Sequence, residues 1–266
     1  MSAPGRITRE ELVALVDERR DAVRAYLDWA LANERRAAAN DKPQWSMRME
    51  NRPDIRDAKD AADLFPEQWW GVVVFTCFGS KLGANTAASY FQHPVSAEEA
   101  ERLLREFNFP RGSVGHHRIQ STTTGAKQAL VSACDHADFF HDVLHSAGDF
   151  DTRYKRLRHA RMRQWGRTTC FDLLLRAGAL AVAGTRYFPD LAYLAGSTGP
   201  RKGFAAVLGR PLTDESAAWG ERVLGAWADH WDEVARQVGA EWEGAPLYPR
   251  DQENFLCIYQ EQPRAH

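Results

Sequence analysis

The chain has 266 residues, of which 44% are hydrophobic and 26% are charged. This composition is typical of a globular protein, and the length suits one large domain or two small ones. The formal net charge of −2 excludes a strongly basic overall field of the kind that attracts nucleic acid from a distance.

Helical patterns begin near the N-terminus. Residues 8–11 (Thr-Arg-Glu-Glu) have the pattern of a capping box, and apolar residues at helical spacing follow, which predicts a helix to about Ala38. Residues 40–66 are polar and contain three prolines, so we expect a loop or short helical pieces there. The apolar run 69–78 is short enough to be either a buried strand or a buried helix, and we favour the helix.

Helices dominate from Ser96 onward. Further helices are predicted over 96–107, 125–147, 167–183, 200–208 and 213–238, and the C-terminal run around Phe255 also has helical character. We therefore predict a mainly α-helical fold, a single compact domain with an N-terminal helical extension. Its predicted parts are an N-terminal helix with a polar connection (1–65) and a helical domain (66–262).

The cysteines and the apolar segments limit the protein class further. The four cysteines lie far apart and form no C-x-x-C pair, so neither a zinc ribbon nor a disulfide framework is expected. No segment approaches the roughly 18 apolar residues of a membrane span, and the N-terminus has no apolar signal segment. We expect a cytoplasmic protein without membrane contact, and no cofactor motif is present.

A basic run leads into a mixed polar and apolar helix. Seven cations lie in this run: Arg153, Lys155, Arg156, Arg158, Arg161, Arg163 and Arg167. Such a run forms either a solvated helix face or the lining of an anion site. Asp172 follows among leucines, where an unpaired buried carboxylate is costly. It therefore caps the helix, pairs with Arg167 or Arg176, or acts as a general base.

A second polar segment spans residues 196–203. Pro200 suits the start of a helix, and the Ser197 and Thr198 hydroxyls combine with Arg201 and Lys202 into a candidate anion cradle. The spacing differs from that of a Walker A loop. The alternative is an ordinary capped turn.

Other residues are weaker candidates. Glu253 and Gln260 flank Cys257 on the C-terminal helix and are candidates to face a cleft; the Cys257 thiol lacks a neighbouring base, and we interpret it as buried. Covalent catalysis by Cys170 is not favoured, although it lies near a helix start. Two further sets complete the candidates. His117 and Thr122–Thr124 lie in a polar loop and are candidates for ligand binding. We interpret His136, His141 and His145 as partly exposed side chains on an amphipathic helix, and we expect no metal site there.

Three strings carry a family resemblance. Gly-Arg-x-x-x-Phe-Asp-x-Leu (166–174), Gly-Ser-Thr-Gly-Pro-x-x-Gly (196–203) and Glu-x-x-Leu-Cys-x-x-Gln (253–260) resemble the helical amino acid:DNA transferases, also called α-glutamyl/putrescinyl thymine pyrophosphorylases. These are distant relatives of helical DNA glycosylases. The likeness covers about residues 66–262. It departs beside Glu253, where a second acid is expected and Gln252 stands.

The resemblance implies a nucleobase-modifying enzyme acting on DNA. An amine, from an amino acid or polyamine, would displace pyrophosphate from an activated hydroxymethyl-pyrimidine base that is extruded from the DNA. It implies that Asp172 accepts or orients the amine's proton and that Glu253 holds the amine or the base edge. The residues implied to bind phosphate or substrate are Arg167, Thr169, Ser197, Thr198, Arg201, Lys202, His117 and Gln260.

Three alternatives remain open from the sequence. A DNA glycosylase-like hydrolase on the same fold would also use Asp172. A non-catalytic nucleic-acid-binding module would explain the basic run but not the two acids. A small-molecule enzyme acting on a phosphorylated nucleotide or metabolite would need the anion cradle without a DNA surface.

Overall fold

The structure is a computed structural model of the chain and describes residues 7–39, 48, 53–106, 109–115 and 122–260. Within these ranges it contains fourteen helices and no strand, which confirms the predicted mainly α-helical class. The helices are α1 (Arg9–Glu18), α2 (Arg20–Ala39), α3 (Pro53–Ala62), α4 (Gln68–Phe78), α5 (Lys81–Ala88), α6 (Ala97–Glu106), α7 (Thr123–Asp135), α8 (Ala137–His145), α9 (Phe150–His159), α10 (Arg167–Ala179), α11 (Gly199–Leu208), α12 (Ala217–Asp229), α13 (Trp231–Val238) and α14 (Pro249–Tyr259).

Contacts divide the chain into two compact units. Unit 1 consists of Met1–Arg52 together with Asp190–His266, and unit 2 consists of Pro53–Pro189. The N-terminal helices α1 and α2 therefore share a unit with α11–α14, from the other end of the sequence. The proposed functional boundary between 1–65 and 66–262 stays a prediction. In the described part of the chain, no helix is both long and apolar enough to cross a lipid bilayer.

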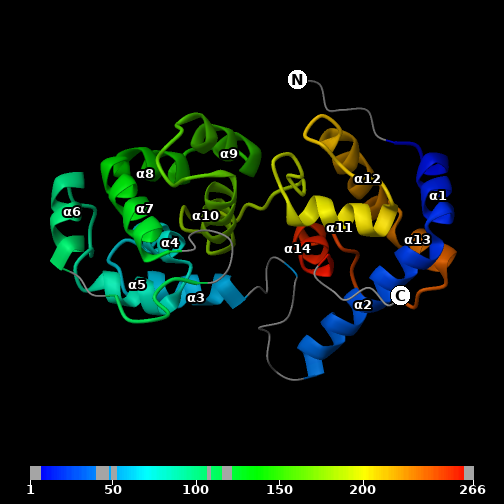
Figure 1. Cartoon of the computed structure of the whole chain (residues 1–266), viewed down its shortest axis with the longest axis horizontal. Helices are drawn as coiled ribbons and strands as arrows, with labels where there is room; N and C mark the ends of the chain where they lie inside the picture. The colour runs from blue at the N-terminus through cyan, green and yellow to red at the C-terminus, as the bar shows by residue number, and fades with distance from the viewer. Residues whose placement is uncertain (1–6, 40–47, 49–52, 107–108, 116–121, 261–266) are drawn as a thin grey trace. The chain divides into compact units, whose positions relative to one another are not determined.

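Unit 2 is built around α4, which lies in the middle of its helices (Figure 1). Every residue of α4 from Trp69 to Phe78 is buried, and the helix contacts α3, α5, α7, α8 and α10. The helix that we favoured for 69–78 is thus confirmed. Gly71 is needed for the contact with α3, because a Cβ atom there would lie 2.6 Å from the Ala62 Cα.

Unit 1 packs α1, α2 and α11–α14 around one apolar core that contains Tyr26, Phe204, Trp227 and Phe255. Helices α11 and α14 pack closely at two glycines of α11, Gly199 and Gly203. A Cβ atom on Gly203 would lie 2.0 Å from the Leu256 carbonyl oxygen, so only glycine allows this backbone approach. The turn before α11 is thereby fixed against the middle of α14.

Three predicted helices are each interrupted at a single residue, which corrects the sequence-based boundaries. The breaks fall at Arg19 (φ −123°, ψ 26°), His136 (φ −119°, ψ 25°) and His230 (φ −116°, ψ 29°). These backbone angles lie near the sparsely allowed bridge region, where a helix ends without a long loop. The break at Arg19 lets α1 and α2 both contact α13. Apolar spacing continues across such a break, so periodicity does not reveal it.

Thr122–Thr124, which the sequence analysis assigned to a polar loop, instead form the N-cap and first turn of α7. Three other local predictions agree with the structure. The Thr8 capping box is present, with the Thr8 hydroxyl accepting from the Glu11 N–H at 3.1 Å. Ser96 caps α6 through the Glu99 N–H at 3.2 Å. Within the polar segment 40–66, α3 is one of the expected short helical pieces.

Candidate functional site

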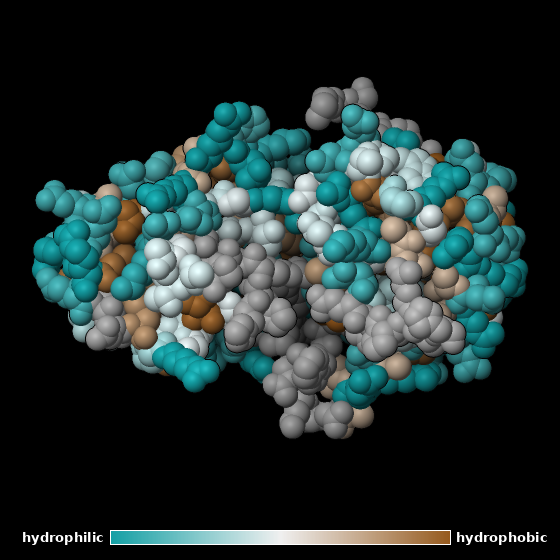
Figure 2. All heavy atoms as spheres, in the orientation of Figure 1, coloured by the Kyte–Doolittle hydropathy of each residue, from teal (hydrophilic) through white to brown (hydrophobic). Residues whose placement is uncertain are grey.

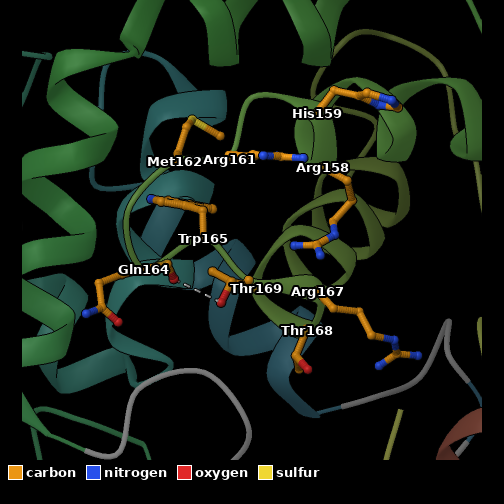
Figure 3. A pocket seen from close by; sticks show the side chains of 10 residues that line it. Arg158, His159, Arg161, Met162, Gln164, Trp165, Arg167, Thr168 and Thr169 are labelled. Atoms are coloured by element: carbon orange, nitrogen blue, oxygen red, sulfur yellow. Dashed lines mark hydrogen bonds between the residues drawn. The ribbon is translucent and has the colours of Figure 1, made fainter. Parts of the chain in front are cut away.

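A pocket of about 740 Å³ lies in unit 2 where α9 leads into α10 (Figure 3). We call it the basic pocket. Its lining residues are Arg158, His159, Arg161, Met162, Gln164, Trp165, Gly166, Arg167, Thr168 and Thr169. Three arginines and a histidine are the titratable groups in this lining, and none of the lining residues is acidic. The pocket therefore offers a positive environment to a ligand.

The first turn of α10 forms one wall of this pocket. The N-cap residue is Gly166, which has no side chain to accept from the first-turn N–H groups, and the first turn contains no acidic residue. These N–H groups carry the positive end of the helix dipole. A Cβ atom on Gly166 would meet no atom within 4 Å, so the backbone is open to an approaching group. This is the arrangement in which helix N-termini bind anions.

The basic run identified in the sequence divides into different environments. Arg153 is buried and serves the fold: its guanidinium donates to the carbonyl oxygens of Val143, Ser146 and Gly148 near the end of α8 and lies 4.0 Å from the centre of the Tyr187 ring.

The outer face of α9 carries two ion pairs. Lys155 pairs with Asp151, and Arg156 pairs with Asp142. Both pairs are exposed and contribute little to stability. Hydrophilic residues cover most of the α6 and α9 surface on the displayed face, and hydrophobic residues there form small separate areas (Figure 2). The interpretation as a solvated helix face therefore holds for Lys155 and Arg156, whereas Arg158, Arg161 and Arg167 line the basic pocket.

The loop between α9 and α10 is strained and firmly anchored. Arg161 and Gln164 have φ of 48° and 66°, in the left-handed region that costs a non-glycine residue about 1–2 kcal/mol. The Gln164 amide donates to the Gln128 side chain at 3.0 Å, and the buried Trp165 indole donates to the Ala129 carbonyl at 3.1 Å. These two contacts hold the loop against α7, with Arg161 at the pocket.

Asp172 belongs to a buried network in the middle of α10. Its carboxylate lies 3.8 Å from the Arg176 guanidinium, so the pairing with Arg176, one of the alternatives that the sequence left open, is present. Arg176 also donates to Asp54 at 3.1 Å and to the Thr76 hydroxyl at 3.2 Å, and it lies 5.1 Å from the centre of the Phe75 ring. Both Asp172 and Arg176 are almost fully buried. Removal of one partner of an ion pair at this depth is strongly destabilising, because it leaves a buried charge without its counter-ion.

Cys170 lies near the start of α10 but is not an activated thiol. Burial raises the pKa of Cys170 to about 11, and the neighbouring Arg158 offsets this only in part. Its thiol is directed at the Trp165 carbonyl oxygen at 3.5 Å. Nucleophilic cysteines have lowered pKa values, so this environment argues against covalent catalysis by Cys170.

In unit 1, the turn before α11 is held by its own hydrogen bonds. The buried Ser197 hydroxyl donates to the Leu194 carbonyl at 2.8 Å. Arg201 bonds the Ser197 carbonyl and pairs with Asp214 at 2.6 Å, and the same carboxylate accepts from the Gly196 N–H. Lys202 and Thr198 are exposed, and Pro200 lies in the first helical turn. Of the two cations in this segment, Lys202 is therefore the more accessible to a ligand.

Helix α14 buries four consecutive polar residues, Asp251, Gln252, Glu253 and Asn254. Glu253, Cys257 and Gln260 share one helix face by their spacing. Cys257 is half-buried, which corrects its interpretation as a buried thiol. Gly199 packs against it, because a Cβ atom on Gly199 would lie 2.4 Å from the Cys257 Sγ. Helical spacing thus places Glu253 and Gln260 on the face of α14 whose Cys257 packs against the first residue of α11.

Glu221 is a buried acid that the sequence did not single out. From α12, its carboxylate accepts from the backbone N–H groups of Ala192 and Leu194. Between them, Tyr193 has a φ of 52°. Glu221 therefore fixes the chain just before the Ser197 turn. A glutamate on a helix gives no sequence signal for such a role.

The histidine candidates have different outcomes. His117 lies outside the described residues. The rings of His141 and His145 stack with their centroids 4.1 Å apart, as their spacing on one helix predicts. Within the described ranges, no three His, Cys, Asp or Glu residues are grouped so that they could hold a metal ion.

The predicted site residues therefore form two groups. Arg167 and Thr169 line the basic pocket, and Asp172 lies further along the same helix. The residues around α11 and α14 belong to unit 1: Ser197, Thr198, Arg201, Lys202, Glu253 and Gln260. Comparison with protein families gives a single match that covers the elements of both groups. Residues 55–266 match the amino acid:DNA transferase (ADDT) family.

The chain belongs to this family. The match spans most of the chain and confirms the resemblance carried by the three sequence strings. It begins inside α3, so it includes the basic pocket, Asp172 and the α11–α14 pair but not α1 and α2. Comparisons with curated proteins and with solved structures found no match. Membership in the amino acid:DNA transferase family supports a transferase that joins an amino acid to DNA.

Proposed function

We propose that this amino acid:DNA transferase attaches an amine to a hydroxymethyl-pyrimidine in DNA whose hydroxyl oxygen carries a pyrophosphate. The amine nitrogen forms a bond to the methylene carbon, the bond from that carbon to the diphosphate oxygen breaks, and pyrophosphate leaves with the electron pair. One proton must be removed from the incoming ammonium group. The family match over residues 55–266 carries this proposal.

The proposed chemistry requires cations that bind phosphate groups and carboxylates that handle the amine. Positive charge favours a leaving diphosphate and the phosphates of DNA. The basic pocket, with Arg167 and Thr169 in its lining, offers such charge. On the other unit, Lys202, Thr198 and Arg201 surround the start of α11. We assign phosphate or substrate binding to these residues, to Ser197 through the turn it stabilises, and to His117 and Gln260.

Two carboxylates are proposed to handle the amine. Asp172 and Glu253 are both almost fully buried, on α10 and α14 respectively. A carboxylate within hydrogen-bond reach of an ammonium group can bind it and accept its proton. We propose that Asp172 accepts or orients the proton of the attacking amine and that Glu253 holds the amine or the edge of the base.

The test is intact-mass analysis of an oligonucleotide that carries pyrophosphorylated hydroxymethyl-uracil. It is incubated with the protein and with a mixture of amino acids and polyamines. We expect a mass change equal to the exchange of pyrophosphate for one amine, abolished in Asp172→Asn and retained in Arg163→Ala, which alters an exposed cation outside the pocket. Release of the free base with an abasic product would replace the proposal with hydrolysis of the glycosidic bond.

A further inference from the structure

We propose that the basic pocket is a phosphate-binding site in which Arg158 and Arg161 grip the phosphate oxygens. The pocket geometry carries this assignment, and only the identity of the phosphate-bearing molecule rests on the proposed function. Arg158 lies in the last turn of α9 and Arg161 lies in the following loop, so neither belongs to the sequence motifs from which Arg167 and Thr169 were identified.

The first argument is the convergence of two uncompensated charges. The guanidinium groups of Arg158 and Arg161 extend toward the same part of the pocket, while Arg167 and His159 point away from them (Figure 3). Neither Arg158 nor Arg161 forms an ion pair among the described residues. The titratable groups that interact with Arg158 include the Cys170 thiol and the Tyr154 hydroxyl, and burial raises the pKa of both, which keeps them neutral near neutral pH. Two cations that share a space without a carboxylate repel each other, and a bound anion relieves this repulsion.

The second argument is the supply of backbone donors on the same side. The first turn of α10 carries no acidic residue, and the open backbone at Gly166 lets an oxyanion approach its N–H groups. Two guanidinium forks together with a helix N-terminus offer more donors than one carboxylate can accept, whereas a phosphate group has three or more acceptor oxygens. The donor set therefore fits a phosphate.

The third argument is the difference between neighbouring cations. Lys155 and Arg156 have carboxylate partners, and Arg153 is used by carbonyl oxygens of the fold. Of these five cations, Arg158 and Arg161 are the two that line the pocket and have no carboxylate partner among the described residues. Arg161 also has a left-handed backbone, a strained conformation that is found more often at functional sites than elsewhere.

Phosphate oxygens reach this pocket from one of two sources in the same substrate. One source is the diphosphate on the activated base, and the other is a phosphate of the DNA backbone. Both present the same chemistry to the arginines, and a direct binding experiment separates them.

The experiment uses the full chain and two probes. Inorganic pyrophosphate is titrated by calorimetry, and a fluorescent unmodified oligonucleotide is titrated by anisotropy at several salt concentrations. The variants are Arg158→Ala and Arg161→Ala. Arg163→Ala is the matched control, because Arg163 lies in the same loop, is exposed and does not line the pocket. Arg161→Gly, which suits the left-handed backbone, replaces Arg161→Ala if that variant is unstable.

We expect Arg158→Ala and Arg161→Ala to weaken phosphate binding about tenfold or more, with Arg163→Ala close to wild type. Loss of pyrophosphate affinity assigns the pocket to the diphosphate. If pyrophosphate does not bind, loss of oligonucleotide affinity with a salt slope lowered by about one per arginine assigns it to the backbone. Equal effects of Arg161→Ala and Arg163→Ala on both probes, or no effect, would overturn the proposal. Failure of amine transfer with pocket binding intact would instead count against the proposed function.

Discussion

The carboxylate of Asp172 lies 3.8 Å from the guanidinium of Arg176, one turn further along α10. The same guanidinium reaches Asp54 on α3 at 3.1 Å. One buried cation thus faces two carboxylates from different helices of unit 2. This arrangement makes Arg176 more important for stability than either acid, although Asp172 is the residue proposed to act in catalysis.

Replacement of Arg176 by Met is expected to lower the free energy of unfolding by about 3–5 kcal/mol. Asp172 and Asp54 would then remain in a largely buried site without their shared cation. Urea denaturation followed by circular dichroism measures this loss.

Asp172→Asn is the matched variant, because it keeps the size of the side chain and leaves Arg176 paired with Asp54. We expect a smaller loss of about 1–2 kcal/mol together with loss of amine transfer. Equal destabilisation by the two variants would contradict a shared cation.

The contact between α11 and α14 leads to a second prediction. Gly203→Ala would place a methyl carbon 2.0 Å from the Leu256 carbonyl oxygen, and backbone cannot move aside as a flexible side chain does. We expect the free energy of unfolding to fall by about 1–3 kcal/mol or more, and transfer to weaken because Glu253 is carried on the displaced helix.

Gly225→Ala is the control for this change. Gly225 also lies within a helix, α12, but a Cβ atom there would meet nothing within 4 Å. Alanine is therefore expected to stabilise the protein by about 0.5–1 kcal/mol. Thermal unfolding of both variants checks the sign, and destabilisation by Gly225→Ala would show that helix propensity does not govern that site.

The sequence predicted contacts within one helix better than contacts between helices. The pairing of Asp172 with Arg176 was among the alternatives that the sequence offered, because residues four apart meet on any helix. The participation of Asp54 could not be predicted, since it depends on how α3 packs beside α10. Glu221 was missed for the same reason: its acceptors, Ala192 and Leu194, are backbone groups that leave no mark in the sequence.

Motif and charge patterns located the candidate site only in part. The basic run directed attention to the segment before α10, but it did not distinguish the buried Arg153 from the pocket residues Arg158 and Arg161. That distinction depends on the end of α8 and on the turn at Arg161, both of which are tertiary features. The helix interruptions at Arg19, His136 and His230 were missed because apolar periodicity continues through them.

The left-handed backbone at Arg161 leads to a third prediction. Arg161→Gly should be more stable than Arg161→Ala by about 0.5–1 kcal/mol, because glycine accepts a φ of 48° without strain but loses more chain entropy on folding. Both variants should lose phosphate binding equally. Thermal unfolding and pyrophosphate titration separate the two effects, and a stabilising effect of alanine over glycine would show that the backbone strain is absent.

The four thiols provide a fourth prediction, which depends on pH. Burial raises the pKa of Cys134 and of Cys170 to about 11 and raises that of Cys77 well above its usual value, whereas Cys257 is only half-buried. At pH 8, about one in a thousand molecules of a thiol with a pKa near 11 is in the reactive thiolate form.

A thiol reagent at pH 8 should therefore modify Cys257 in the folded protein, and the three buried cysteines should react only in denaturant. Absorbance of the released chromophore counts the modified thiols, and Cys257→Ser should remove the reaction in the folded state. Because the raised pKa makes thiolate scarce near neutral pH, the reactivity of Cys170 should increase only as the pH approaches 11, and Cys170→Ser should retain amine transfer. Rapid modification of Cys170 at pH 8, or loss of transfer in Cys170→Ser with the fold intact, would restore it as a candidate nucleophile.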